Sequence, residues 1–280
     1  MAKLIAGIGT SHIPAIGAAM DSGKTEEAYW QSLFEGIQPA RDWMAEKKPE
    51  VCIIVYNDHA SAFSLEAIST FAIGVADEFP PADEGYGPRQ VPTVQGHSRF
   101  AWHIAESLIL DDFDMTIINK MPVDHGLTVP LSVMYDQPAQ WPCQVIPVCV
   151  NVIQYPQPSG KRCYNLGKAI RRAVDSFDED INVVIMGTGG MSHQLQGERA
   201  GVINTEFDKK WLNAMVEDPQ SILDISRTEY FREAGSEGIE LVMWLIMRGA
   251  LDADVDEVYR FTRVPVSNTH YGLTVLENQN

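Results

Sequence analysis

The chain has 280 residues, of which 45% are hydrophobic, and its formal net charge is -17. That charge argues against nucleic acid as a partner, because phosphate binding needs a basic face, and no window reaches the ~20 consecutive apolar residues that a bilayer requires. The first nine residues hold a Lys and a short apolar run, as signal peptides do, but polar residues from Thr10 onward interrupt it, so we do not expect secretion. The four cysteines form no CxxC pair and predict a reduced, cytoplasmic protein.

Apolar, β-rich runs alternate with helical patterns along the chain, beginning with a strand over 4–9 and a helix over 25–46. Strands that alternate with helices of this length are typical of a mostly parallel sheet covered by helices. We therefore predict an α/β fold, with a single domain over 1–280 and a mostly parallel or mixed central sheet flanked by helices. Further strands are expected at 51–56, 115–119, 144–152 and 181–187, with β character returning after 255, and further helices at 95–110, 162–177, 204–216, 219–225 and 237–250.

The segment EFPPADEGYGPRQVP, residues 78–92, is rich in Pro and Gly and predicts a long irregular loop. Loops of that length in compact domains are often functional lids or disordered segments. Both readings stay open for this loop.

Four of the seven histidines stand just after the carboxyl ends of predicted strands, namely His12, His59, His125 and His193. In open α/β sheets, ligands bind in the crevice outside those strand ends. A buried imidazole needs a partner for each polar nitrogen, so core packing is a poor explanation for four of them together. The four histidines predict a metal site at this edge of the sheet.

The other three histidines carry a weaker signal. His97 and His103 fall in a predicted helix, where a surface or capping role is expected, and His270 near the C-terminus is compatible with either role. Motifs of other enzyme classes are absent, since the chain has no HExxH, no GxSxG elbow and no GxGxxG after the first strand. The Gly-rich stretch 186–192 lacks a Walker lysine and instead presents His193 on a turn.

A divalent ion held by neutral imidazoles needs a carboxylate to balance its charge, and Glu240 is the best candidate. It lies in the first turns of the predicted helix 237–250, among mostly apolar neighbours and close to the buried face. An inward Glu without a partner would be costly, so we expect it to meet a cation. Glu237 is the better candidate for the helix-dipole interaction. The pattern leaves open that Glu240 is an exposed residue on a mixed helix.

Four motifs together resemble the LigB-type (class III) extradiol ring-cleavage dioxygenases. They are GTSHIP around His12, YNDH ending at His59, GTGGMSH ending at His193 and GIEL around Glu240. The resemblance runs from the first strand to the terminal SNTHYGL and so covers essentially the whole chain. Each motif alone is modestly specific, whereas all of them in this order are strongly so.

By this resemblance, His12, His59 and Glu240 are the ligands of Fe(II), a facial triad of two histidines and one carboxylate with open positions on one side. His193 is the general base, and His125 is a second active-site imidazole near substrate and oxygen. The substrate-binding residues that the resemblance implies are Asn57, Ser267 and Asn268. Asn57 would also support the metal ligands from behind.

The resemblance implies extradiol cleavage of a catechol by O2 with Fe(II) and no organic cofactor. The base takes a proton from a phenol that the metal acidifies. The expected subtype cleaves protocatechuate at the 4,5 position, giving 4-carboxy-2-hydroxymuconate semialdehyde. Gallate-type relatives carry an additional C-terminal domain over the site, whereas this sequence stops just after SNTHYGL. We therefore expect a small α subunit to cover the active site, in an α2β2 assembly.

Three alternatives remain at this point. The first is a related ring-cleaver of gallate, an aminophenol or another catechol. The second is a family member without metal that acts as a binding or signalling protein, against which the complete set of metal and base residues argues. The third is a zinc hydrolase.

Overall fold

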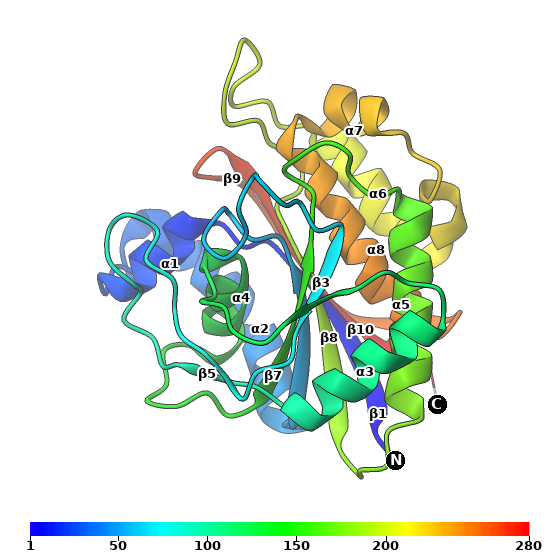
Figure 1. Cartoon of the computed structure of the whole chain (residues 1–280). Coiled ribbons are helices and arrows are strands. Elements are labelled where there is room, and N and C mark those ends of the chain that lie inside the picture. Colours follow the sequence, from blue (N-terminus) through cyan, green and yellow to red (C-terminus); the bar gives the residue numbers. More distant parts are fainter. Residues whose placement is uncertain (280) are drawn as a thin grey trace.

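A computed structural model describes residues 1–279 and centres on an eight-stranded mixed sheet (Figure 1). The strands are β1 (Lys3–Thr10), β2 (Val51–Tyr56), β3 (Phe71–Gly74), β6 (Thr116–Ile118), β7 (Gln144–Val150), β8 (Asn182–Thr188), β9 (Val255–Val266) and β10 (Thr269–Asn278). They lie in the order β6-β3-β7-β2-β8-β1-β10-β9. The central strands β7, β2, β8 and β1 are parallel, while β3 and β10 pair antiparallel with β7 and β1. The short strands β4 (Glu78–Phe79) and β5 (Val94–Gln95) form a separate pair.

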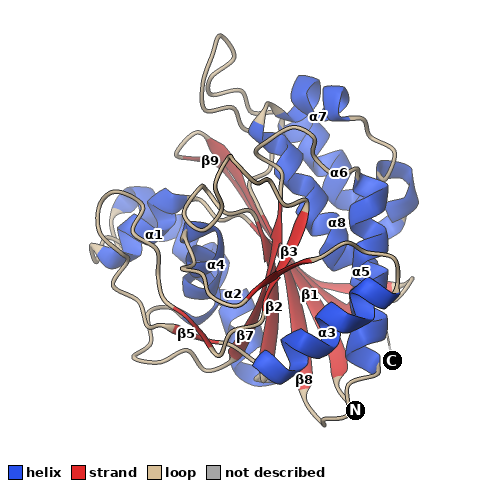
Figure 2. Cartoon of the chain, in the orientation of Figure 1, coloured by secondary structure: helices blue, strands red, loops and turns tan. Residues whose placement is uncertain are grey.

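Helices cover both faces of this sheet (Figure 2). One face carries α1 (Pro14–Asp21), α2 (Ala28–Lys47) and α4 (His125–Tyr135). The other carries α3 (Ser98–Leu110), α5 (Gly160–Asp175), α6 (Thr205–Glu217), α7 (Arg227–Ala234) and α8 (Leu241–Ala250), with the 3₁₀ turns η1 (Pro219–Ile222) and η2 (Glu237–Glu240). No helix in the described part of the chain combines the length and the apolar character needed to cross a bilayer.

The sequence VCIIVY of β2 shows why the sheet is covered on both sides. All six residues are buried. Ile53 and Val55 join the apolar cluster on the α5 and α8 face, whereas Ile54 and Tyr56 join the cluster on the α2 and α4 face. Because successive strand side chains point to opposite faces, a continuous apolar run is what a doubly covered parallel strand requires.

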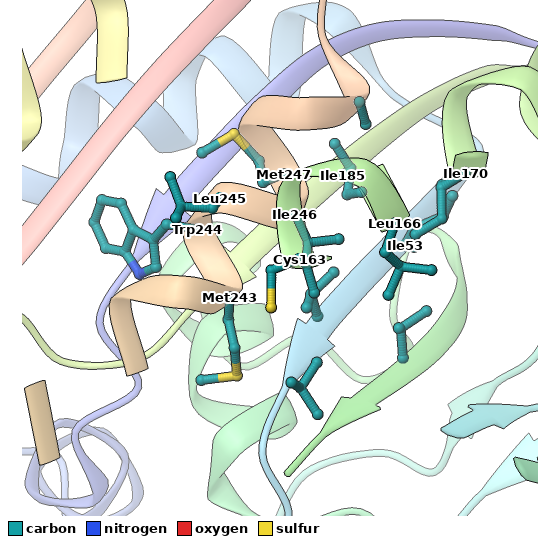
Figure 3. Close-up of a cluster of buried hydrophobic side chains, with 14 of the residues drawn as sticks. Ile53, Cys163, Leu166, Ile170, Ile185, Met243, Trp244, Leu245, Ile246 and Met247 are labelled. Atoms are coloured by element: carbon teal, nitrogen blue, oxygen red, sulfur yellow. The ribbon is translucent and has the colours of Figure 1, made fainter. Parts of the chain in front are cut away.

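Glycines let α8 pack directly on the sheet, and this contact positions Glu240. A Cβ atom on Gly9 of β1 would overlap the indole ring of Trp244 in α8. Figure 3 shows the side chains of α8 from Met243 to Met247 packed among those of α5, β2 and β8. A Cβ on Gly189, just after β8, would lie 2.6 Å from Cβ of Glu240. The start of α8 therefore reaches the carboxyl ends of β1 and β8.

The predicted α/β class, with a mixed central sheet flanked by helices, is confirmed. The five predicted strands are present within a few residues of their expected bounds. The sequence interpretation did not contain α1, α4, α7 or β3. The stretch 219–225 forms only the short turn η1, and the stretch 237–250 is divided into η2 and α8 at Glu240.

Candidate active site

Three parallel strands deliver histidines to one edge of the sheet. His12 stands just beyond β1, His59 just beyond β2 and His193 in the loop after β8. These strands are neighbours in the order β2-β8-β1, so their carboxyl ends meet. His125 comes from the first turn of α4, and its ring centroid lies 3.9 Å from that of His59 and 5.7 Å from that of His12.

The structure brings the predicted metal residues into one cluster. One nitrogen each of His12, His59 and His125 lies within 4.8 Å of the others. Glu240 joins the cluster beside His12, where its Oε1 is 3.5 Å from His12 Nε2. The resemblance groups Glu240 with His12 and His59 and places His125 near substrate and oxygen. In the structure, by contrast, the three closely grouped side chains are His12, His59 and His125, with Glu240 adjoining them through His12.

Hydrogen bonds turn the Nε2 lone pairs of two histidines inward. Nδ1 of His12 lies 3.0 Å from the hydroxyl of Thr188, whose own hydrogen is directed at the carbonyl of Gly126, so His12 Nδ1 is the donor. Nδ1 of His59 donates to Asp124 Oδ2 at 3.0 Å. A hydrogen bond at one ring nitrogen decides which nitrogen is free for a metal. Nδ1 of both imidazoles is thereby engaged by the protein, which leaves Nε2 as the nitrogen that would ligate a metal.

Glu240 is ionised although only 7% of its surface is exposed. Burial works to raise the pKa of its carboxyl, but the charge and hydrogen bond of His12, together with His193 and His59, outweigh burial and lower that pKa to about 2. The backbone amide of Gly190 also donates to Oε2 at 2.6 Å. Burial lowers the pKa of His12 in spite of the neighbouring Glu240, which favours the neutral imidazole that a metal binds.

This donor set fits a divalent metal ion. Two imidazole nitrogens and one carboxylate with an open side are the ligands typical of non-haem Fe(II). A buried carboxylate among imidazoles needs a cation beside it, which is either a proton on an imidazole or a metal ion in its place. Asn57 gives a second indication, because its buried Oδ1 has no hydrogen-bond partner while its Nδ2 lies 3.1 Å from His59 Nε2. Unpaired buried polar atoms are uncommon in folded proteins, and a bound ion or ligand nearby is one explanation for them.

His193 faces the cluster from the side of Glu240. Its Nδ1 donates to the carbonyl of Met191 at 2.7 Å, so the free Nε2 points inward, 3.9 Å from Glu240 Oε2. The ring is buried and lies beside Glu240, and its nitrogens are not among the three closely grouped ones. This arrangement suits a group that accepts a proton at Nε2.

His125 is held by the long loop that the sequence left without a role. Glu84, within 78–92, accepts hydrogen bonds from both the ring Nδ1 and, at 3.0 Å, the backbone amide of His125. The same loop is anchored at its far end, where Arg89 pairs with Asp21 at 2.8 Å. This segment is therefore tied to the cluster at one point and to α1 at another.

Ser267 and Asn268, predicted to bind substrate, form the exposed turn between β9 and β10. Their side chains hydrogen-bond each other at 2.8 Å. The next residue, Thr269, bridges to His193, so the turn flanks the cluster but is not part of it. His97 caps α3 by accepting from the amide of Phe100, as the sequence indicated.

Sequence reasoning missed several side chains that support the cluster. They are Thr188 behind His12, Asp124 behind His59, Glu84 behind His125, and the pair Asp208–His270 behind the His193 loop. Asp124 is the N-cap of α4, where its Oδ1 accepts from Gly126, but the sequence interpretation did not contain this helix. The other pairings join residues far apart in the sequence.

A cavity of about 250 Å³ opens beside His59, on the loop that follows β2. Its lining is mostly apolar, with Phe63, Leu65, Ile68 and Ile153 contributing, and His59 is the only one of the clustered side chains that reaches it. Leu65 and Ile68 are also largely exposed. The surface next to the metal residues is therefore apolar on this side.

Residues 6–274 match a family model described as the catalytic LigB subunit of aromatic ring-opening dioxygenase. The chain belongs to this LigB family. The resemblance seen in the sequence motifs is thereby confirmed, and with it membership of a family of ring-opening dioxygenases.

Individual relatives of the chain are also named as dioxygenases. A protein of Pseudomonas putida named gallate dioxygenase is 43% identical over 198 residues, which cover 71% of this chain and 58% of the relative. A 2,3-dihydroxyphenylpropionate/2,3-dihydroxicinnamic acid 1,2-dioxygenase of Photorhabdus laumondii is 28% identical over 201 residues, covering 71% and 59%. The chain thus spans less than two thirds of the length of these two relatives. The crystal structure of an uncharacterised protein from Escherichia coli K12 shares the fold, with a TM-score of 0.62 over 98% of this chain and 100% of that one at 11% identity.

Proposed function

We propose that this chain is an Fe(II)-dependent extradiol dioxygenase that opens the ring of a catechol with O2. The observation that carries the proposal is the meeting of two inward Nε2 atoms and a buried carboxylate, from His12, His59 and Glu240, with His193 facing them. Membership of the LigB family supports the reaction class.

His12, His59 and Glu240 would hold the iron, which supplies Lewis-acid and redox chemistry when bound. His193 accepts a proton at Nε2 from a catechol hydroxyl, because its Nδ1 hydrogen is already committed to Met191. His125 is fixed by Glu84 and its ring lies against that of His59, so it would contact a substrate bound next to His59. The chain's own contribution is thus to orient the substrate and to move one proton.

For the substrate we propose a benzoate that carries adjacent ring hydroxyl groups, with protocatechuate cleaved at the 4,5 position as the first candidate. Gallate is the second, favoured by the 43% identity to a protein named gallate dioxygenase. The two differ by one hydroxyl group. A site that hydrogen-bonds this hydroxyl can discriminate strongly against the analogue that lacks it. The ratio of the turnover rates with gallate and with protocatechuate therefore shows which of the two the site is built to bind.

We also propose that a small, separate α chain covers the site, in an α2β2 assembly. The exposed side chains of Leu65 and Ile68, next to His59, and the fully exposed Tyr86 on the loop of Glu84 support a partner at this edge. A catechol and oxygen must be kept from bulk water during the reaction. Expression with and without a neighbouring small gene product, followed by size analysis and activity, tests this assembly.

The decisive experiment loads the protein with Fe(II) under anaerobic conditions and measures oxygen uptake with protocatechuate, gallate and 2,3-dihydroxyphenylpropionate. We expect one O2 consumed per ring opened and a product heavier by two oxygen atoms. Absence of iron binding would favour a binding or signalling protein, and hydrolysis that requires zinc in place of iron would favour a metallohydrolase.

A further inference from the structure

A second buried ionisable cluster lies behind the loop that carries His193. Asp208 on α6 is fully buried, with an exposed fraction of 0%, and it does not contact the metal residues. A buried carboxylate is costly unless hydrogen bonds compensate for the lost water. The partners of Asp208 all belong to two segments at the edge of the candidate site.

The first segment is the loop immediately before His193. Both carboxylate oxygens of Asp208 lie 3.1 Å from the backbone nitrogen of Ser192, and the Ser192 hydroxyl also donates to Oδ2. The Ser192 oxygen in turn accepts from the amide of Asn204 at 2.8 Å. Asp208 therefore fixes the main chain and the side chain of the residue next to His193.

The second segment is the start of β10. Nδ1 of His270 donates to Asp208 Oδ2 at 2.6 Å. The amide of His270 donates to the carbonyl of Ser192 at 3.2 Å, and its carbonyl accepts from Met191 at 3.3 Å. His270 follows the turn of Ser267 and Asn268 after a single residue, so the carboxylate holds this turn and the His193 loop together.

We propose that Asp208, acting with His270, is the positioning residue for His193. The orientation of the His193 ring depends on the local main chain, because its Nδ1 donates to the carbonyl of Met191. If Ser192 shifts, Met191 and His193 shift with it. Displacement of a reacting group by about 1 Å can lower turnover about 10²-fold. The inference rests on the proposed function in that it takes His193 as the group that moves the proton.

Replacing Asp208 with Asn keeps the size of the side chain and removes its charge. The variant therefore distinguishes positioning by hydrogen bonds from simple filling of space. The carboxylate of Asp208 accepts from three donors, which are the Ser192 amide, the Ser192 hydroxyl and His270 Nδ1. The Asn amide has the same shape but offers one oxygen and two N–H groups. Its N–H groups would therefore face at least one of these three donors. None of the hydrogen bonds of Asp208 goes to His12, His59 or Glu240.

The test measures iron content, kcat and KM for the iron-loaded Asp208→Asn protein. We expect unchanged iron stoichiometry and a kcat lowered by about 10- to 100-fold. Tyr230→Phe is the matched control, because it removes the acceptor of Trp211, a buried donor on α6, without touching the His193 loop. Wild-type kcat and KM in a folded Asp208→Asn protein would overturn the proposal.

A pair of variants at His270 keeps the test open if Asp208→Asn fails to fold. His270→Asn retains a donor at the position of Nδ1, whereas His270→Leu removes it, so turnover should be largely kept in the first and lost in the second. Equal turnover in the two would refute the assignment. Hydrogen exchange of residues 190–193 needs no substrate, and it should rise in Asp208→Asn but not in Tyr230→Phe. If exchange rises in Asp208→Asn while the wild-type protein opens no catechol, the proposed function fails. The conclusion that Asp208 fixes the loop of His193 then still holds.

Discussion

Asp124 accepts two hydrogen bonds from His59, one from the backbone amide at 2.6 Å and one from the ring Nδ1 at 3.0 Å. The same carboxyl group caps α4 by accepting from the amide of Gly126 at 2.9 Å. One buried side chain thus fixes the position of the histidine, the orientation of its ring and the start of the neighbouring helix.

Asp124→Asn should weaken metal binding by about 10- to 100-fold, the usual effect of losing an outer-shell partner of a ligating histidine. An Asn remains a good helix cap, so thermal stability of the metal-free protein should change little. Titration with Fe(II) under anaerobic conditions gives the affinity, and a thermal melt gives the stability. Equal affinity in the two proteins would mean that His59 is oriented by other contacts.

Metal affinity should also depend on pH in a defined direction. Burial works to lower the pKa of His59, but the hydrogen bond and charge of Asp124 raise that pKa above its ordinary 6.5. A metal must displace the proton, so affinity should begin to fall while the pH is still above 6.5, by about tenfold per unit. In the metal-free protein, the contribution of His59 to the free energy of unfolding changes with pH in the opposite direction. The stability that His59 contributes is complete below pH 6.5 and is lost as the pH rises through the raised pKa.

Titrations of metal affinity and of melting temperature between about pH 5.5 and 8.5, from roughly one unit below to two units above the ordinary histidine pKa, measure both effects. In Asp124→Asn the fall in affinity should move to lower pH. A fall at the same pH in both proteins would exclude the His59–Asp124 pair as its cause.

Glu240→Gln should remove most of the bound iron, because an amide supplies neither the charge nor the ligand strength of a carboxylate. Glu237→Gln is the matched control in the same 3₁₀ turn. Glu237 accepts from the amide of Leu195 and the hydroxyl of Ser236, which the amide oxygen of Gln can still do. Metal analysis after desalting should show iron in the control and little in Glu240→Gln. The reverse result would transfer the ligand role to Glu237.

The strand ends could be predicted from the sequence because apolar β-rich runs and the polar residues after them are local features. Helix α4 could not, since every residue from Gly126 to Met134 is buried and the segment has no polar face to give a helical period. Pro130 inside it also argued against a helix. α1 begins at Pro14 and has only 8 residues, too few to show a clear helical period.

The same distinction applies to the candidate site. His12, His59 and His193 each follow a strand, so their convergence follows from a parallel sheet. The pairing of His125 with Glu84, by contrast, spans 41 residues and depends on the path of an irregular loop. Such a contact leaves no periodic or spacing signal in one sequence.

His193→Ala should keep its iron but lose turnover by about 10²- to 10⁴-fold, the usual contribution of a positioned acid–base group. The ring is buried beside Glu240 and is not among the closely grouped nitrogens, so metal affinity should change little. Oxygen uptake with a saturating catechol, together with its pH dependence, checks the role. An unaltered rate and pH profile would assign the proton transfer to His125 or to water.

Gly9→Ala tests whether the close packing of α8 sets the metal site. The added methyl group would overlap the ring of Trp244, and overpacking of this kind costs about 1–3 kcal/mol. Relief of the overlap pushes α8 away from β1 and moves Glu240 from His12, so iron affinity should fall together with the free energy of unfolding. Gly23→Ala is the control, because a Cβ there meets no atom within 4 Å. The φ of +64° at Gly23 makes Ala unfavourable by about 1 kcal/mol, so the free energy of unfolding should fall while iron affinity stays unchanged. Urea unfolding and iron titration of the two variants separate the effects, and iron affinity lowered equally in both would show that it follows general stability instead of the placement of α8.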